Sequence, residues 1–218
     1  MSNFVAEIIG PAGAGKTSLS QLLRRGQDVR SGLSVWGLPP TLLGISAFYS
    51  MPNLVALCLQ RKCFNWEDLK LVIQHNALLR LLNTESTKGY QALLLDEGTV
   101  FALAKLRAFG TQTVTAGDDH WMQSLFNKVA SRLNAVIWLD APDAVLARRI
   151  RERDKPHRMK AGSDAEIENH LSLYRKSFER VVAELSKRNG LKVFRYRTDE
   201  VSLEEIATKV LLEARAQV

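Results

Sequence analysis

The most constraining feature of the sequence is an octapeptide near its start, Gly-Pro-Ala-Gly-Ala-Gly-Lys-Thr at 10–17. It has the spacing G-x-x-x-x-G-K-[ST], and it lies between an apolar run at 5–9 and a helical pattern at 18–25. Glycines permit a tight loop whose backbone N–H groups converge on phosphate oxygens, and the start of the helix directs further N–H groups at the same anion. The sequence therefore predicts a strand, a phosphate-binding loop and a helix in succession.

The residue types in this loop indicate its ligands. We expect Lys16 to place its charge on the β- and γ-phosphates, and the Thr17 hydroxyl to complete a magnesium shell. The predicted nucleotide-binding residues of the loop are Gly10, Ala12, Gly13, Ala14, Gly15, Lys16, Thr17 and Ser18. The expected ligands are a nucleoside triphosphate, with ATP as the donor, and Mg²⁺.

Elsewhere the chain alternates short apolar runs with longer helical patterns. The runs that predict strands cover 4–9, 33–38, 92–95, 135–139 and 191–196. The third and fourth show no polar alternation, which is typical of strands buried on both faces. This alternation predicts an α/β fold, with a parallel sheet between helices, in a single domain over 1–218.

Several helix ends are also readable. Asn65 precedes two acidic residues, and Ser163 and Ser202 each stand three residues before a glutamate, so all three are predicted helix starts. Gly190 is the predicted end of the long helix before the last strand.

Two carboxylates follow the buried strand at 92–95. In a parallel sheet, Asp96 and Glu97 would face the same crevice as the phosphate loop. A strand-end acid is what phosphoryl-transfer enzymes of this kind use to hold magnesium, so we expect Thr17 and Asp96 to be the metal-binding residues. Glu97 projects differently and is a candidate base for an attacking hydroxyl or water, although Asp96 remains an alternative for that role.

Positive charge is concentrated in one segment. The chain carries a net charge of +7, which alone is compatible with nucleic acid, anionic lipid or a phosphorylated small molecule as partner. Residues 148–160 contain seven basic and two acidic side chains, and this accounts for most of the excess. A surplus packed beside a phosphate loop favours a triphosphate and makes a nucleic-acid partner less expected.

With these motifs in place, the chain resembles the thymidylate kinase-like and other nucleoside monophosphate kinases. The run LDAPDAVLARRIRERDKPHR at 139–158 looks like their fourth strand, helix and arginine lid, and the order of motifs is similar over nearly the whole chain. The resemblance implies a P-loop NTPase fold of three layers, with five parallel strands in the order 2-3-1-4-5 and a short lid at about 148–162.

The resemblance also implies site residues. Arg149 would lie near the adenine or its phosphates, Arg153 and Arg158 would close on the transferred phosphate, and Arg197 would flank the adenine. Together with the loop and the strand-end acids, the predicted catalytic residues are Lys16, Asp96, Glu97, Arg149, Arg153 and Arg158.

The acceptor half departs from the family pattern. Thymidylate kinases carry Asp-Arg and a third residue where this chain has Asp-Glu-Gly at 96–98, and the carboxylate that deoxynucleoside kinases place after their second strand is missing from 35–40. The resemblance places the acceptor in a helical region at about 40–83 and 99–121. Trp36, Phe48, Tyr49 and Phe101 are candidates to stack on it, and Arg80 to meet an anionic group.

Three functions stay open at this stage. The first is a kinase for a nucleotide or another small molecule, and the second a P-loop ATPase or nucleotide-gated binding protein, which the Asp96–Glu97 pair would also suit. The third is a kinase acting on polynucleotide ends. The apolar stretch 42–59 is broken by polar residues and predicts core or pocket lining instead of a membrane span. The two cysteines, Cys58 and Cys63, indicate a reduced, cytoplasmic protein, and a homodimer is one candidate for its oligomeric state.

Overall fold

The computed structural model describes residues 3–26, 28–61, 65–110, 120–154 and 158–216. Its strands are β1 (Phe4–Ile9), β2 (Val29–Leu33), β3 (Ala92–Asp96), β4 (Ala135–Asp140) and β5 (Lys192–Arg197). Its helices are α1 (Lys16–Leu23), α2 (Pro40–Arg61), α3 (Trp66–Ser86), α4 (Thr99–Phe109), α6 (His120–Ala130), α7 (Asp143–Glu152), α8 (Asp164–Asn189) and α9 (Leu203–Ala216). The strands pair in parallel in the order β2-β3-β1-β4-β5, which confirms the predicted topology.

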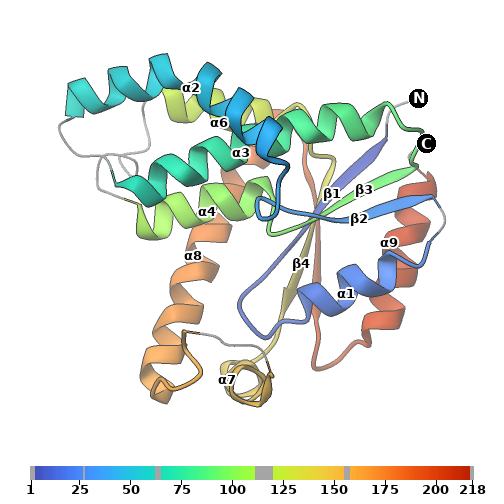
Figure 1. Ribbon diagram of the computed structural model, residues 1–218. Helices are drawn as coiled ribbons and strands as arrows, with labels where there is room; N and C mark the ends of the chain where they lie inside the picture. Colours follow the sequence, from blue (N-terminus) through green and yellow to red (C-terminus); the bar gives the residue numbers. More distant parts are fainter. Residues whose placement is uncertain (1–2, 27, 62–64, 111–119, 155–157, 217–218) are drawn as a thin grey trace.

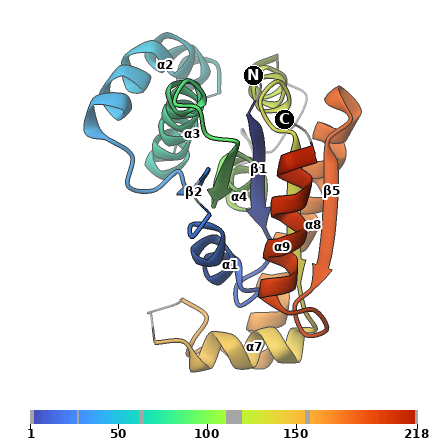
Figure 2. The ribbon, with the colours of Figure 1, turned by 90° about the vertical axis from the view of Figure 1, so that its right-hand side faces the viewer.

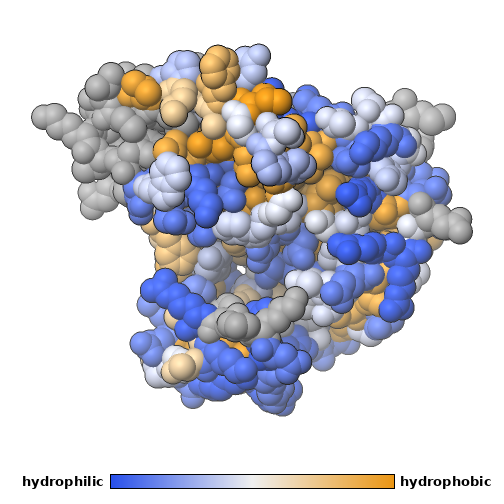
Figure 3. All heavy atoms as spheres, viewed as in Figure 1, coloured by the Kyte–Doolittle hydropathy of each residue, from blue (hydrophilic) through white to orange (hydrophobic). Residues whose placement is uncertain are grey.

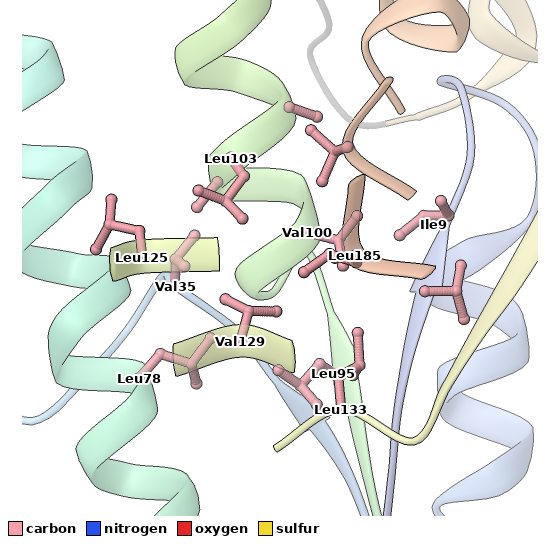
Figure 4. Close-up of a cluster of buried hydrophobic side chains, with 14 of the residues drawn as sticks. Ile9, Val35, Leu78, Leu95, Val100, Leu103, Leu125, Val129, Leu133 and Leu185 are labelled. Carbon is pink, nitrogen blue, oxygen red and sulfur yellow. The ribbon is translucent and has the colours of Figure 1, made fainter. Parts of the chain in front are cut away.

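Helices cover both faces of the sheet, and each face has its own core (Figures 1 and 2). Helices α1 and α9 pack on one face with apolar residues of α7 and the start of α8. On the other face, α3, α4, α6 and most of α8 bury a larger cluster, seen in Figure 4, where Leu78 of α3, Leu103 of α4 and Val129 of α6 converge. Parallel strands feeding helices on both sides bury both faces, which explains the unbroken apolar runs of β3 and β4.

The position of the second strand was predicted incorrectly. The apolar run 33–38 is mainly a loop, and β2 occupies Val29–Leu33 instead. As an edge strand, β2 forms hydrogen bonds only to β3. Because one side of it is open to solvent, a segment containing the charged Arg30 and the small Gly32 can form this strand. The side chains of Val35 and Leu38 are buried although they follow the strand, which is why their segment read as one.

The predicted helix ends are confirmed. The Asn65 side chain accepts a hydrogen bond from the Glu67 N–H at 3.2 Å, and Ser163 forms a complete capping box with Glu166. Ser202 Oγ accepts the N–H of Glu205 in the same way. These contacts satisfy N–H groups that a helix start leaves without intrahelical partners.

Helix α2 contains the whole stretch 42–59 that was expected to be core or pocket lining. Five of its large apolar side chains are exposed, namely Ile45, Phe48, Tyr49, Met51 and Val55, and of these Tyr49 also lines a cavity. The orange band along the top of Figure 3 includes this helix. No helix in the described part of the chain is long and apolar enough to cross a bilayer.

Candidate active site

The phosphate loop is shaped by glycines that no other residue could replace without strain. Gly10, Gly13 and Gly15 have φ values of 144°, 82° and 90°, a region that L side chains rarely adopt. A Cβ atom on Gly10 would lie 2.1 Å from the carbonyl oxygen of Leu139 at the end of β4. The loop therefore lies directly against β4, and α1 begins at its end with Gly15 as the N-cap.

Lys16 folds back over this loop. Its Nζ donates hydrogen bonds to the carbonyl oxygens of Gly10 at 2.9 Å and Pro11 at 3.0 Å. Burial lowers the pKa of the ammonium, while the charges of Glu97 and Asp96 raise it and that of Arg153 lowers it. Lys16 thus lies where the strand-end acids and the predicted lid meet.

Asp96 is a suitable magnesium ligand. Burial, and then the charge of Glu97, raise the pKa of its carboxyl, while Lys16 and a hydrogen bond from Thr17 lower it. Its Oδ1 is buried and has no hydrogen-bond partner in the described part of the chain, and a buried carboxylate oxygen is rarely left so. A cation beside Thr17 would satisfy this atom and favour the ionised carboxylate.

Such an ion would need ligands from outside the protein. Within the described ranges, no group of three or more His, Cys, Asp or Glu side chains could hold a metal. Mg²⁺ commonly keeps several waters and binds one or two carboxylates together with substrate phosphates. The Thr17 hydroxyl and the Asp96 carboxylate fit that coordination.

Glu97 is held in a rare backbone conformation. Its φ is 57°, the only positive value at a non-glycine residue in the described chain. The N–H of Val35 donates to its carbonyl oxygen at 3.1 Å, and the Trp36 indole N–H donates to its Oε2 at 2.6 Å. The loop after β2 therefore fixes both the backbone and the side chain of Glu97, with Oε1 left to meet a ligand. Strained residues fixed in this way tend to occur at functional sites.

A buried glutamate of β1 accepts hydrogen bonds from the residues that follow Glu97. Glu7 of β1 accepts hydrogen bonds from the N–H groups of Gly98, Val100 and Phe101 and from the Thr99 hydroxyl, at 2.8–3.0 Å. It replaces the N-cap that Gly98 cannot supply to α4. Burial raises the pKa of Glu7 to about 7, and the four hydrogen bonds lower it. Glu7 was not predicted from the sequence, because nothing in an apolar strand reveals which helix start a glutamate side chain will reach.

On the opposite side of the loop, Arg149 joins three segments. From α7 it donates to the carbonyl oxygen of Gly13 at 3.4 Å, and to the hydroxyl and carbonyl oxygens of Thr198 at 2.8 and 3.0 Å. Arg197 lies beside this contact but is turned into ion pairs with Asp199 and Glu200. The structure thus brings Arg149 and the segment after β5 to the phosphate loop.

The other two predicted lid arginines lie farther along. Arg153 ends α7, and its charge is near enough to affect the pKa of Lys16. Arg158 is exposed, and its charge lowers the pKa of His170 and opposes the rise at Tyr174. Residues 155–157 of the predicted lid, and 111–119 of the predicted acceptor region, lie outside the described residues.

Arg175 of α8 fixes the base of α7, a role that the sequence did not indicate. It donates to both carboxylate oxygens of Asp140 at 2.9 Å and forms an ion pair with Asp143 at 2.5 Å. It therefore connects α8 to the end of β4 and to the first turn of α7. The carboxylates of the LDAPD sequence are engaged here rather than at the phosphate loop.

Aromatic rings extend from Glu97 toward the predicted lid. The ring of Phe101 lies 6.4 Å from that of Trp36 and is stacked 6.4 Å from that of Tyr174, which also contacts Phe109. Burial, followed by the charge of Glu97, raises the pKa of Tyr174 to about 12, against the effect of Arg158. Figure 3 shows a hollow between the upper helices and the α7 end of the molecule. Trp36 and Phe101 thus lie together near Glu97, whereas Phe48 and Tyr49 pair on α2.

A cavity of about 260 Å³ opens beside the strand-end acids. Thr17, Asp96 and Glu97 form one side of it, and residues of α1 and of the segment from β2 to Trp36 form the other. Gly32, with a φ of 82°, lets the Arg24 guanidinium approach its backbone closely. Gln21, Arg24 and Ser34 were missed from the sequence, because they face Glu97 only once β2 is placed at 29–33.

Similar solved structures share this architecture. Thymidylate kinase from Candida albicans aligns with a TM-score of 0.59 at 9% identity, over 99% of this chain and 92% of that one. The YorR protein from Bacillus subtilis, in complex with phosphorylated GDP, aligns with a TM-score of 0.55 at 14% identity, over 98% and 96%. The chain has a P-loop kinase fold.

A third structure with the P-loop kinase fold is the tunicamycin resistance protein of Deinococcus radiodurans. Its TM-score is 0.52 at 15% identity, over 97% of this chain and 95% of that one. The sequence itself matches no protein-family model and no curated protein. At such low identity the likeness establishes the P-loop kinase fold and leaves the acceptor to be inferred from the site.

Proposed function

We propose that the protein is a Mg²⁺-dependent phosphotransferase that moves the γ-phosphate of ATP to a small-molecule acceptor. The observation that carries this proposal is the buried, unpartnered Oδ1 of Asp96 beside Thr17, at the mouth of the phosphate loop. A carboxylate oxygen left without a protein donor in that position suits a cation that arrives with the triphosphate. When bound, Mg²⁺ would supply positive charge to the β- and γ-phosphate oxygens.

The donor side rests on backbone and basic groups. N–H groups of the loop and of the first turn of α1 would bind the phosphates. The Lys16 ammonium would exchange its contacts with Gly10 and Pro11 for phosphate oxygens, and Arg153 would add charge from the end of α7. Arg149 holds the loop to the segment after β5, where Arg197 would flank the adenine.

The acceptor side rests on Glu97. An acceptor hydroxyl in the 260 Å³ cavity would lose its proton to the Glu97 carboxylate as its oxygen bonds to the γ-phosphorus. The bond from that phosphorus to the β,γ-bridging oxygen would break, and ADP would leave with the electron pair. The polar side chains of Gln21, Arg24 and Ser34 favour a hydroxylated acceptor at this end. The helical region predicted from the resemblance stays a prediction for the rest of the acceptor.

The decisive experiment is transfer from ATP labelled in its γ-phosphate to a pool of metabolites, followed by identification of the labelled product. We expect a labelled phosphate ester from the native protein and none from Asp96→Asn. Release of labelled inorganic phosphate alone, at a rate that no metabolite changes, would instead support the second candidate, a P-loop ATPase. That candidate is favoured by the pair of carboxylates at the end of β3.

Removing the indole N–H of Trp36 is predicted to impair the proposed role of Glu97 as the base without impairing ATP binding. Trp36→Phe keeps a ring against Phe101 but deletes the 2.6 Å donor to Oε2. Because hydrogen bonds to charged groups contribute about 1.5–3 kcal/mol, we expect turnover to fall about 10-fold with little change in ATP affinity. Steady-state kinetics and ATP titration would measure this, with Trp66→Phe as the matched control at an exposed tryptophan of α3. Unchanged turnover would exclude orientation of Glu97 by Trp36.

The end of α7 gives a further prediction. Arg153→Ala removes a charge close to Lys16, so it should lower turnover about 10-fold or more while weakening ATP binding less. Arg180→Ala, at an exposed position of α8, is the control and should leave both values near native. Native turnover in Arg153→Ala would remove this arginine from the mechanism.

A further inference from the structure

A second and larger cavity lies between α2, α3 and α6. It measures about 350 Å³ and shares no lining residue with the cavity at Glu97. Arg132 lies at one end, three residues before the start of β4, whereas the phosphate loop and Asp96 lie where their strands end. A six-residue strand spans about 20 Å, so the two cavities lie near opposite ends of the strands.

The walls of this cavity carry positive charge only. Arg80 of α3, and Lys128 and Arg132 at the end of α6, line it, and none of its lining residues is acidic. Among the described residues, no carboxylate forms an ion pair with any of the three. Some basic side chains elsewhere on the surface are paired, as Arg195 is with Glu179. Three unpaired cations around one cavity create a potential that attracts anions.

The cavity is also partly preorganised. The Arg80 guanidinium lies 4.7 Å from the centre of the Tyr49 ring, which holds it at the cavity wall. The Asn76 amide donates to Ser50 at 3.0 Å and joins α3 to α2 at the same wall. A guanidinium held by a ring loses less freedom on binding than a free one.

The buried histidine beside the cavity, His75, carries no charge at physiological pH. Burial, and then the charge of Lys128, lower the pKa of His75 to about 4, so His75 is neutral at physiological pH. Lys128 of α6 and Arg80 of α3 line the same cavity, so the basic groups of the two helices act on the same space.

We propose that this cavity is a binding site for a small phosphorylated molecule, separate from the phosphate loop. Two arginines and a lysine suit a phosphate dianion, because guanidinium groups bind phosphate oxygens in pairs. The volume of about 350 Å³ falls within the range of small-molecule sites, about 300–1,000 Å³. The site therefore takes a phosphorylated metabolite, and it does not depend on the proposed phosphotransferase activity.

Calorimetric titration of the full-length protein with pyrophosphate and with AMP tests the proposal. The background is Lys16→Ala, in which binding at the phosphate loop is weakened. We expect saturable binding to persist there and to weaken at least 10-fold when Arg80→Gln and Arg132→Gln are added. Arg30→Gln and Arg180→Gln, which lie outside the cavity, form the matched pair and should leave binding unchanged.

Three results would overturn the proposal. These are no saturable binding of either probe, equal binding by the Arg80→Gln/Arg132→Gln variant, or equally tight binding of citrate, which would indicate a general anion surface. If the double variant fails to fold, Lys128→Gln alone should weaken binding in a folded protein. Failure of the labelled transfer assay would leave the titration result standing, so the two proposals are tested separately.

Discussion

Lys16→Ala is expected to reduce phosphoryl transfer about 100- to 1,000-fold. The Nζ of Lys16 lies over the loop on the carbonyl oxygens of Gly10 and Pro11, close to both strand-end acids. Charge moves from the γ-phosphorus toward the bridging oxygen during transfer, and loss of one such donor commonly costs about 2.7–4 kcal/mol. Burial removes water from the ammonium and so lowers the pKa of Lys16, and an anionic phosphate would offset that loss of hydration.

The measurement is single-turnover transfer from labelled ATP at saturating concentration. Lys209→Ala, at an exposed lysine of α9 that pairs with Glu205, is the matched control and should behave as the native protein. Thermal unfolding of both variants would confirm that they are folded. A Lys16→Ala protein with more than about a tenth of native turnover would contradict a role for this charge in the transition state.

Glu7→Ala is expected to lower the free energy of unfolding by about 4 kcal/mol. The substitution leaves three buried N–H groups and a hydroxyl at the start of α4 without their acceptor, and each such loss costs about 1–3 kcal/mol. For a chain of this length the melting temperature should fall by about 10 °C. Glu179→Ala, which breaks only an exposed ion pair with Arg195, should cost less than about 1 kcal/mol.

Glu7 also predicts how stability depends on pH. Its pKa is raised from 4.5 to about 7 in the folded protein, so folding takes up a proton between those values. The resulting stabilisation is complete at acidic pH and is lost as the pH rises through 7. The free energy of unfolding of the native protein, measured with denaturant, should therefore fall between pH 5 and pH 7 relative to that of Glu7→Gln, whose side chain cannot titrate. Parallel pH profiles would show that Glu7 is already ionised across this range.

Much of the fold was predictable because its signals are local. The glycine spacing at 10–17 fixed the first strand, loop and helix, and apolar runs buried on both faces marked β1, β3 and β4. Strand order came from the family resemblance, since no local pattern encodes which strands pair. The edge strand β2 escaped prediction because half of its surroundings are solvent, so burial left no regular pattern in its sequence.

The site was predictable in part for the same reason. The sequence predicted Lys16, Thr17 and Asp96, and the structure brings these motif residues together. Glu7, Trp36 and Tyr174 reach Glu97 or its turn across long sequence separations, and their types and spacing carry no sign of it. Trp36 was considered only as a ring that stacks on the acceptor, whereas its indole N–H binds Glu97. Such contacts depend on tertiary packing alone.

The left-handed backbone of Glu97 sets stability against activity. Holding a glutamate there costs about 1–2 kcal/mol, whereas glycine or asparagine would adopt the same φ at a lower cost. Repeated selection for heat resistance alone would therefore tend to replace this residue, and with it the carboxylate that the proposed reaction requires. Variants of this protein chosen for thermostability should be checked first at position 97, because a gain in melting temperature there would come with a lost base.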